Sequence, residues 1–221
     1  VEYGKENKYD DDIFFQKYSQ MSRSQQGLAG AGEWETLRKL LPDFKDKRVL
    51  DLGCGYGWHC IYAMEHGASS VVGVDISHKM LEVAKEKTHF PQVEYKCCAI
   101  EDVEFPEESF DVILSSLAFH YVADYEILVK KIYRILKSGG KLVFTVEHPV
   151  FTAYGTQDWY YNEKGEILHF PVDNYYYEGK RTAVFLGEKV TKFHRTLTTY
   201  LNTLLSNGFI INHIVEPQPP E

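Results

Sequence analysis

The stretch Val49–Trp58, VLDLGCGYGW, places three glycines at alternate positions directly after a short apolar run. Glycine weakens a strand or a helix because its backbone loses more freedom on folding than that of other residues, so this density needs a reason. A bare backbone turn between a strand and a helix lets ligand atoms approach exposed N–H groups. The stretch therefore predicts a strand, a glycine turn and a helix that together bind a ligand.

The spacing of the glycines narrows the ligand. Gly53, Gly55 and Gly57 read G-x-G-x-G, whereas a dinucleotide fingerprint reads G-x-G-x-x-G. No Lys-Ser or Lys-Thr pair follows, which excludes a phosphate-binding P-loop. Asp51 precedes the glycines, and a carboxylate is a poor neighbour for a pyrophosphate because the two anions repel each other. The same carboxylate suits a ligand with an ammonium group.

A second carboxylate adds a sugar to this description. Asp75 ends the apolar run VVGVD, which is the next strand expected along the chain. A carboxylate at the end of the second strand can accept hydrogen bonds from both hydroxyls of a ribose. The implied ligand therefore carries a ribose and a cationic end, and it needs no phosphate.

Apolar runs alternate with amphipathic segments through the middle of the chain. The expected strands are Arg48–Leu52, Val71–Asp75, Val93–Cys97, Asp111–Ser115 and Lys141–Glu147, and the expected helices between them are Trp58–His66, Lys79–Lys87 and Tyr125–Lys137. This alternation predicts an α/β fold, a doubly wound and mostly parallel sheet with helices on both faces. A helix over Thr196–Ser206 and an antiparallel last strand over Phe209–Val215 complete the expected domain.

Two segments fall outside this alternation, and they divide the single expected domain of residues 1–221. Residues 1–45 form a helical cap, with helices over 13–22 and 33–41, before the cofactor-binding core of 46–150. Residues 151–192 are dense in aromatic side chains and read as one or two inserted hairpins, ahead of a last helix and strand in 193–221. The insert is either a β extension with its own small core or, as we expect, a lid over a pocket.

Composition sets limits on partners and location. A formal net charge of −8 disfavours nucleic-acid binding, which calls for a basic surface. No apolar run is long enough to span a membrane, and the polar start of the chain lacks the pattern of a signal peptide. The four cysteines, without a C-x-x-C pair, are typical of free thiols in a reducing compartment. We therefore expect a cytoplasmic protein that binds no metal, no membrane and no nucleic acid.

The sequence leaves two points open. The chain begins at Val1 and ends at Glu221 after Pro-Gln-Pro-Pro, so we expect that its ends are processed termini or boundaries within a longer protein. Nothing in the sequence indicates an oligomeric state.

Four motifs resemble one enzyme family. VLDLGCGYG, VVGVD, FDVILSSLAFHYV and LKSGGKLVFTVEHP occur in the order and spacing of class I S-adenosylmethionine-dependent methyltransferases. The resemblance covers roughly residues 18–150 and is strongest to the small-molecule, methyltransferase-11-like subgroup. It implies a Rossmann-like fold, S-adenosyl-L-methionine as the cofactor, and transfer of a methyl group to an acceptor.

The resemblance also assigns residues to the cofactor. The assigned residues are Tyr18, Arg23, Asp51, Gly53, Cys54, Gly55, Asp75, Ile76, Ala99, Ile100, Glu101 and Ser115. Asp51 would lie near the ammonium group and Asp75 would hold the ribose hydroxyls. Many relatives have Asp-Ala-Glu where this chain has Ala99-Ile100-Glu101, so a side-chain contact to the adenine amine is missing here.

The acceptor side is less constrained, because aligning the reactants and excluding water is most of what a methyl transfer needs. His120 and Tyr121 follow the fourth strand, and His120 is either a base or substrate-orienting residue or only a hydrogen-bonded supporting residue. His148 either binds substrate or caps the strand before Pro149. His194 and Arg195 are surface charges or, after the lid, ligands for a substrate carboxylate.

These features favour a methyltransferase that acts on the oxygen or nitrogen of a small molecule. The alternatives are a protein or nucleic-acid methyltransferase and a non-catalytic scaffold or sensor that binds S-adenosylmethionine. A nicotinamide oxidoreductase is disfavoured by the glycine spacing and by Asp51.

Overall fold

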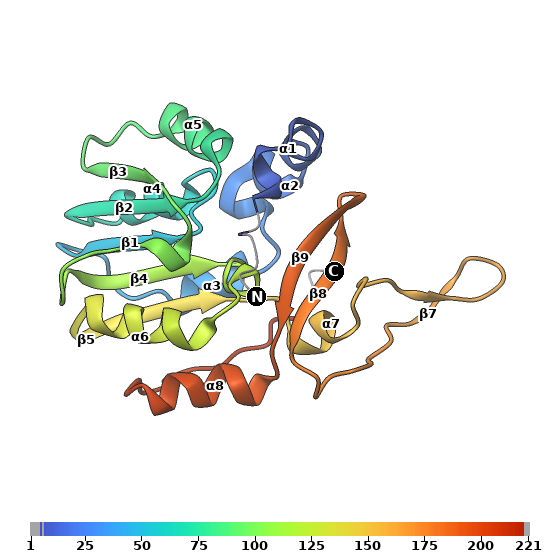
Figure 1. Cartoon of the computed structure of the whole chain (residues 1–221). Helices are drawn as coiled ribbons and strands as arrows, with labels where there is room; N and C mark the ends of the chain where they lie inside the picture. The colour runs from blue at the N-terminus through green and yellow to red at the C-terminus, as the bar shows by residue number, and fades with distance from the viewer. Residues whose placement is uncertain (1–4, 6, 219–221) are drawn as a thin grey trace.

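A five-stranded parallel sheet forms the centre of the molecule in a computed structural model, which describes residue 5 and residues 7–218 (Figure 1). The strands lie in the order β3-β2-β1-β4-β5, so the chain winds outward from β1 in both directions, as predicted. Their bounds are β1 Arg48–Leu52, β2 Ser70–Asp75, β3 Val93–Cys97, β4 Phe110–Ser116 and β5 Leu136–Thr145. The carboxyl ends of β1, β2 and β4 meet at one edge of the sheet, where the ligand is expected.

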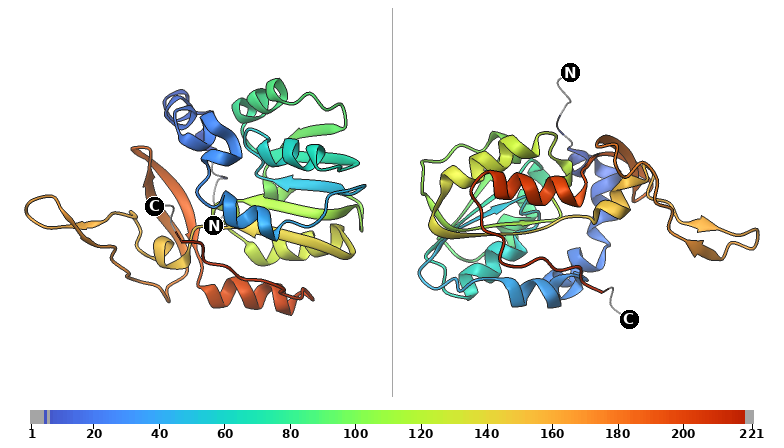
Figure 2. Two further views of the ribbon diagram at one scale, coloured as in Figure 1. Left: turned by 180° about the vertical axis from the view of Figure 1, so that it is seen from behind. Right: turned by 90° about the horizontal axis from the view of Figure 1, so that it is seen from below.

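Side chains alternate between the two faces of the sheet and define two apolar cores. Leu50 and Leu52 of β1 join the core under helices α6 (Tyr125–Ile135) and α8 (Leu197–Ser206). Val49 joins the core on the opposite face, which α4 (Trp58–Glu65) and α5 (His78–Lys87) cover. Figure 2 shows these helix layers from behind and from below. Burial on both faces explains why the strands are continuous apolar runs.

Side-chain caps fix where three of the covering helices begin. The Ser77 hydroxyl accepts from the Met80 N–H at the start of α5, and Asp124 and Thr196 do the same for α6 and α8. Each cap satisfies a backbone donor that the first turn of a helix leaves without a partner. Two short 3-10 turns, η3 (Ile100–Asp102) and η4 (Phe119–Tyr121), follow β3 and β4 at the ligand edge.

The N-terminal residues form a helical cap beside that edge. Its elements are η1 (Lys8–Asp10), α1 (Asp12–Ser19), α2 (Ser22–Gln26), η2 (Gly27–Gly30) and α3 (Trp34–Leu40). The helix expected over 13–22 is interrupted at Gln20 and Met21. Asp10 ties this segment to the sheet, because its carboxylate accepts from the Ser77 hydroxyl at 2.6 Å and from the Lys79 N–H at 3.2 Å.

The aromatic insert folds as two hairpins after a short helix, α7 (Pro149–Ala153). The first hairpin pairs β6 (Tyr160–Tyr161) with β7 (Ile167–His169) and extends away from the body as an arm (Figure 1). The second pairs β8 (Gly179–Phe185) with β9 (Glu188–His194) and stands beside the ligand edge. The prediction of one or two hairpins is therefore confirmed, with the last strand ending two residues later than expected.

Hairpin β8–β9 packs against the N-terminal helix α1 as well as against η4 and α7. Phe14 of α1 is fully buried with Ala183 and Val190, in a cluster separate from the two cores of the sheet. At the tip of the hairpin, the Glu188 carboxylate lies 3.5 Å from the Lys8 ammonium and 3.6 Å from that of Lys17. The N-terminal segment with α1 and hairpin β8–β9 are far apart in the sequence, but they lie together over the ligand edge. We call these two segments the common cover.

Two predictions about the fold are wrong. The strand expected over Phe209–Val215 does not form: these described residues have no ladder partner, and Ile210 is 85 % exposed, although Phe209 and Ile211 pack against the core. The helix expected over Tyr125–Lys137 ends at Ile135, and β5 begins at once, at Leu136 rather than Lys141, with an irregularity in its pairing to β4.

Within the described part of the chain, every helix is too short or too polar to cross a membrane. The predictions about the chain ends concern Val1 and Glu221, which lie outside the described residues.

Replacing Phe14 with alanine should loosen the common cover while leaving the sheet intact. Truncating a fully buried phenylalanine typically costs about 3–5 kcal/mol, and here the loss falls on the contact between α1 and the hairpin. Hydrogen–deuterium exchange should accelerate in residues 12–19 and 179–194 but not in β1 or β4. Ile13→Ala, on the exposed side of the same helix, is the control; equal exchange in the two variants would show that the cluster does not hold the cover.

Candidate functional site

The turn between β1 and α4 leaves backbone open to a ligand. Gly53, Gly55 and Gly57 all have positive φ angles, of 77°, 52° and 75°. A Cβ atom on Gly53 would lie 2.5 Å from the Cβ of Ala118, so this position excludes a side chain. A Cβ on Gly55 would meet no atom within 4 Å, so Gly55 faces open space. The turn thus presents bare backbone to a cavity, as the sequence predicts.

Hydrogen bonds hold this turn against the second strand. The N–H groups of Gly53 and Cys54 donate to the Val74 carbonyl at 2.8 and 2.9 Å. The Gly55 N–H donates to Asp75 Oδ2 at 2.8 Å, and the Ser77 N–H donates to Asp75 Oδ1 at 2.9 Å. Asp75 is therefore fixed in orientation, and each of its oxygens retains a lone pair for a ligand hydroxyl. Burial raises the pKa of Asp75 although these backbone donors favour its charged form.

Asp51 is a buried carboxyl group that lacks a strong partner. It is 1 % exposed, its Oδ1 has no hydrogen-bond partner among the described residues, and its Oδ2 has only the Cys60 thiol at 3.5 Å. Burial raises its pKa to about 7, and the charge of Asp75 acts in the same direction. An unpartnered carboxyl oxygen under the glycine turn is a site for a cationic group or a bridging water.

A cavity joins this turn to the N-terminal cap. It is lined by the predicted residues Tyr18, Arg23, Gly53, Cys54 and Gly55, and by Glu33, which the sequence did not identify. Arg23 donates to both oxygens of the Glu33 carboxylate, at 2.6 and 2.8 Å. Arg23 thus lies where it was expected, but an internal carboxylate holds one of its amino groups.

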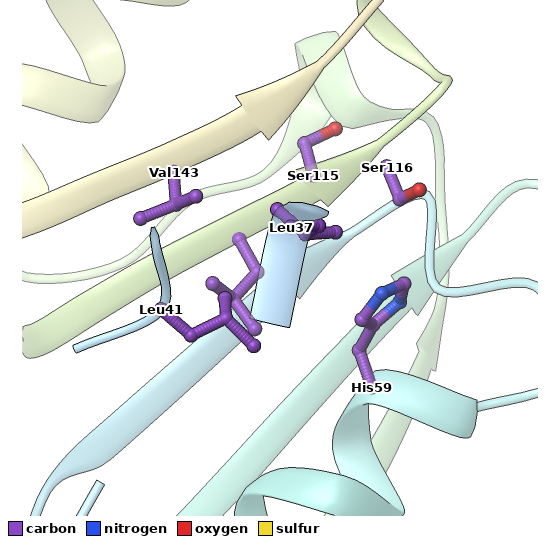
Figure 3. A pocket seen from close by; sticks show the side chains of 7 residues that line it. Leu37, Leu41, His59, Ser115, Ser116 and Val143 are labelled. Atoms are coloured by element: carbon purple, nitrogen blue, oxygen red, sulfur yellow. The ribbon is translucent and has the colours of Figure 1, made fainter. Parts of the chain in front are cut away.

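Ser115 lies next to the last residue of β4. Its hydroxyl donates to the Leu52 carbonyl at 2.7 Å, so the side chain links β4 to β1. It lines a smaller cavity together with His59 and Ser116, whose side chains Figure 3 shows around the same space. Burial lowers the pKa of His59 to about 4, which keeps its ring neutral at pH 7.

The residues expected near adenine lie beside Asp75. Ile76 follows β2 directly, its carbonyl accepts from the Cys97 thiol at 3.5 Å, and the Cys98 N–H donates to the Asp75 carbonyl at 3.0 Å. Ala99 caps the turn η3, which contains Ile100 and Glu101. The Cδ1 of Ile100 would lie 3.4 Å from a Cβ on Gly53, so this turn borders the glycine turn.

His120 and Tyr121 lie in η4, just beyond β4, as expected. His120 is 2 % exposed, and its Nδ1 accepts from the Glu147 N–H at 3.5 Å, which puts the proton of the neutral ring on Nε2. That Nε2 is 4.0 Å from Glu147 Oε1. Burial lowers the pKa of His120 to about 4; Glu147 opposes this shift, and Lys192 and Arg195 add to it.

A ring of polar side chains adjoins His120, and the sequence did not identify it as a site. Lys192 Nζ of β9 lies 2.5 Å from Glu147 Oε1 and 2.9 Å from Gln157 Oε1. Gln157 Nε2 in turn donates to Glu147 Oε2 at 2.9 Å. Lys192 is 2 % exposed, whereas Glu147 keeps 21 % of its side chain accessible. We call Lys192, Glu147 and Gln157 the polar ring.

The N-terminal cap adds a residue that sequence reasoning missed. The Tyr9 hydroxyl lies 3.3 Å from the Tyr121 hydroxyl, and the Tyr9 ring packs edge-on against those of Tyr18 and Phe14. Tyr9 thus connects the cofactor side of the edge to η4. No local pattern marks it, because the contact with Tyr121 spans 112 residues.

The three residues predicted to bind substrate have other partners. His148 is exposed, caps α7 through its Nδ1, and pairs with Glu216 at 2.6 Å. His194 is fully buried, with Thr152 Oγ1 and the Tyr175 carbonyl each 2.8 Å from a ring nitrogen. Arg195 is buried and donates to the carbonyls of Phe119, Phe193, Val122 and Ala123. Their ring nitrogens and guanidinium are thus engaged within the protein, and substrate binding by these three residues stays a prediction.

Among the described residues, no group of three or more His, Cys, Asp or Glu side chains could hold a metal ion.

Comparisons with known proteins connect this geometry to a chemistry. The profile of the methyltransferase domain family matches residues 50–144. A Listeria monocytogenes protein, solved as a candidate S-adenosylmethionine-dependent methyltransferase, is 58% identical over 85% of this chain and 88% of its own, with a TM-score of 0.82. A Mesorhizobium loti S-adenosylmethionine-dependent methyltransferase is 41% identical over 88% of both chains, with a TM-score of 0.81.

One relative that matches a shorter part of the chain has a named reaction. The ubiquinone biosynthesis O-methyltransferase of Coxiella burnetii is 36% identical over 50% of this chain and 47% of its own length. The present chain therefore spans about half of that enzyme.

His120 should make stability depend on pH. Its pKa is near 6.5 in the unfolded chain and about 4 in the folded one, so unfolded molecules bind the proton more strongly as the pH falls below 6.5. Between pH 7 and pH 5 this one group should cost about 2 kcal/mol of stability. The pKa of Asp51 is raised in the folded protein, so protonation of Asp51 increases stability as the pH falls. Because the two effects oppose each other, the contribution of His120 is measured by comparing a His120 variant with the parent protein.

Urea unfolding of His120→Gln should therefore show a smaller loss between pH 7 and pH 5 than the parent protein does. His89→Gln, a substitution at an exposed histidine just after α5, is the control. Identical pH slopes for His120→Gln and the parent would contradict the burial of a neutral His120.

Proposed function

This chain belongs to the S-adenosylmethionine-dependent methyltransferases, and we propose that it methylates a small-molecule acceptor. It is an enzyme of the methyl-transferring class, and S-adenosyl-L-methionine is its cofactor.

The residues at the sheet edge fit this cofactor. Asp51 Oδ1, buried and without a partner among the described residues, is suited to the ammonium group of the methionine part, directly or through a water. The open space at Gly55 lets that part approach bare backbone. The fixed carboxylate of Asp75 is suited to the two ribose hydroxyls. We propose that these three residues hold the cofactor.

Further residues would complete its surroundings. Tyr18 and Arg23 line the same cavity, and we propose that they face the carboxylate end. Ile76 and the Ala99–Glu101 segment border Asp75, a placement that supports contact with the adenine through backbone N–H groups and apolar surface. Ser115 would contribute by holding β4 against β1, since its hydroxyl is already bonded to Leu52.

The main support for a small-molecule acceptor is that the ligand edge is covered where His120 lies. His120 is 2 % exposed, and the N-terminal cap and hairpin β8–β9 close over it through Tyr9, Phe14 and Glu188. A protein or nucleic-acid strand needs an open groove, whereas a small molecule can be enclosed. The net charge of −8 and the name of the Coxiella relative, an O-methyltransferase of ubiquinone biosynthesis, also support this choice. A cytoplasmic location remains a prediction.

The bound cofactor supplies a methyl group already activated on a sulfonium, so the protein has little covalent chemistry to perform. The chain's own residues would orient the acceptor and exclude water. Neutral His120 has its Nδ1 lone pair engaged by the Glu147 N–H, so its Nε2–H is the available group. We therefore propose that His120 orients the acceptor as a hydrogen-bond donor and that Tyr121 lines the same space.

Cofactor binding should release a proton from Asp51. The pKa of Asp51 is about 7 without ligand, and a nearby ammonium group favours the ionised form. Titration calorimetry with S-adenosylhomocysteine at pH 7, in buffers of different ionisation enthalpy, should show release of roughly half a proton. Asp51→Asn should bind more weakly and release none, whereas Glu82→Gln on the exposed face of α5 should match the parent.

The same titration tests the choice of cofactor, because NAD should not compete with S-adenosylhomocysteine. Binding without proton release would remove Asp51 from the cofactor site. Tight NAD binding with no binding of S-adenosylhomocysteine would contradict the cofactor assignment.

Radiolabelled S-adenosylmethionine should methylate a metabolite in a small-molecule extract. The label should appear below a 3-kDa cut-off and not in protein or RNA fractions. His120→Ala should reduce the transfer by about 10²-fold or more, the range of a positioned proton-handling group, while S-adenosylhomocysteine affinity changes little.

Each of the remaining results would contradict the proposal. Label confined to protein or RNA would support the macromolecular alternative. Tight cofactor binding with no labelled product from extracts of several organisms would favour a scaffold or sensor.

A further inference from the structure

The polar ring places a buried ammonium group next to the proposed acceptor position. Lys192 is held by Glu147 and Gln157, and it lies 5.9 Å from the ring centroid of Tyr121 and 5.6 Å from that of Phe185. Burying an ion pair gains little stability over apolar packing of the same volume. Buried charge beside a histidine at the ligand edge is therefore better explained by a function.

The ring connects hairpin β8–β9 with the end of β5. Glu147 follows β5 and lies on the sheet with His120, whereas Lys192 lies on β9. The hairpin that carries Lys192 is packed on α1 through Phe14, Ala183 and Val190, outside both cores of the sheet (Figure 1). The ring thus has Lys192 on one wall and Glu147 with His120 on the other.

Resting on the proposed function, we propose that Lys192 is the specificity-determining residue, which recognises an anionic group on the acceptor. That group takes the place of Glu147 opposite the ammonium of Lys192. Glu147 is released by this exchange and keeps its carboxylate beside the His120 ring, with Oε1 now 4.0 Å from Nε2, while the Nε2–H of His120 donates to the acceptor. The Glu147 N–H, which donates to Nδ1, holds the ring in this orientation, so Glu147 is a positioning residue for His120.

The charges around His120 favour an anion over a cation. The groups facing it are Glu147 after β5, Lys192 of β9, the Arg195 guanidinium and the neighbouring Tyr121. Arg195 is fixed by the backbone carbonyls of Phe119 and Val122, so its positive charge stays in place. The two cations, Lys192 and Arg195, outnumber the one carboxylate, Glu147, so an anionic acceptor is stabilised beside η4.

The test uses the full chain saturated with S-adenosylhomocysteine and four probes of similar shape: benzoate, phenyl phosphate, benzamide and benzylamine. Calorimetry should show benzoate or phenyl phosphate binding at least about tenfold more tightly than benzamide, the lower range for a hydrogen bond to a charged group. Lys192→Met should bring the anion to the level of benzamide. Lys189→Met, an exposed lysine on the same strand, should retain the preference. The more tightly bound anion identifies the carboxylate or phosphate class.

Lys192→Met leaves the partly buried Glu147 without its cation, so this variant could lose binding because it is destabilised. A second variant separates the two causes. The double variant Lys192→Met, Glu147→Gln removes both charges and keeps the shape. Its thermal unfolding should match the parent, and it too should lose the anion preference.

Proton NMR of the His120 ring gives an independent readout. Benzoate should raise the midpoint of its titration in the parent protein, and Glu147→Gln should abolish that rise because the released carboxylate is then absent. A structural role alone would leave the midpoint unchanged by benzoate.

The proposal is overturned by equal binding of benzoate and benzamide, by tightest binding of benzylamine, by no probe binding at all, or by a preference that survives in Lys192→Met. A metabolite acceptor without an anionic group refutes this inference alone. Transfer to protein or RNA, with the anion preference intact, refutes the small-molecule function alone.

Discussion

The ligand edge depends on the attachment of the glycine turn to the end of β2. The N–H groups of Gly53 and Cys54 share the Val74 carbonyl, and the Gly55 N–H reaches Asp75. This attachment sets the backbone of the turn and the orientation of the carboxylate together. A side chain at Gly53 would collide with Ala118, so the turn, β2 and η4 constrain one another.

Buried charge distinguishes the two halves of this edge. On the cofactor side, Asp51 and Asp75 are carboxyl groups whose pKa values burial raises, and a cationic, ribose-bearing molecule relieves that cost. On the acceptor side, His120 is neutral and Glu147 is paired with Lys192. The edge thus provides two buried carboxyl groups where the methyl donor is expected and a paired carboxylate and ammonium where the acceptor is proposed to bind.

Short-range pattern was enough to predict the core, because each strand and helix of a doubly wound sheet has its own periodicity and turn signals. The glycine turn, Asp75, the Ser77 cap and the Thr196 cap all follow from residues near them in the sequence. The polar ring and Tyr9 could not be predicted in this way, since Lys192 meets Glu147 across 45 residues and Tyr9 meets Tyr121 across 112. Arg195 was expected to bind a substrate, but only the fold reveals the four carbonyls around it. The strand expected over Phe209–Val215 fails because it lacks a pairing partner, which its composition does not show.

The most direct test of this account is the crystal structure of the chain soaked with S-adenosylhomocysteine. The account predicts both ribose hydroxyls on the Asp75 carboxylate and the ammonium group bonded to Asp51, directly or through one water. A ligand bound elsewhere, or at this edge with the ribose away from Asp75 and Asp51 still without a partner, would contradict it.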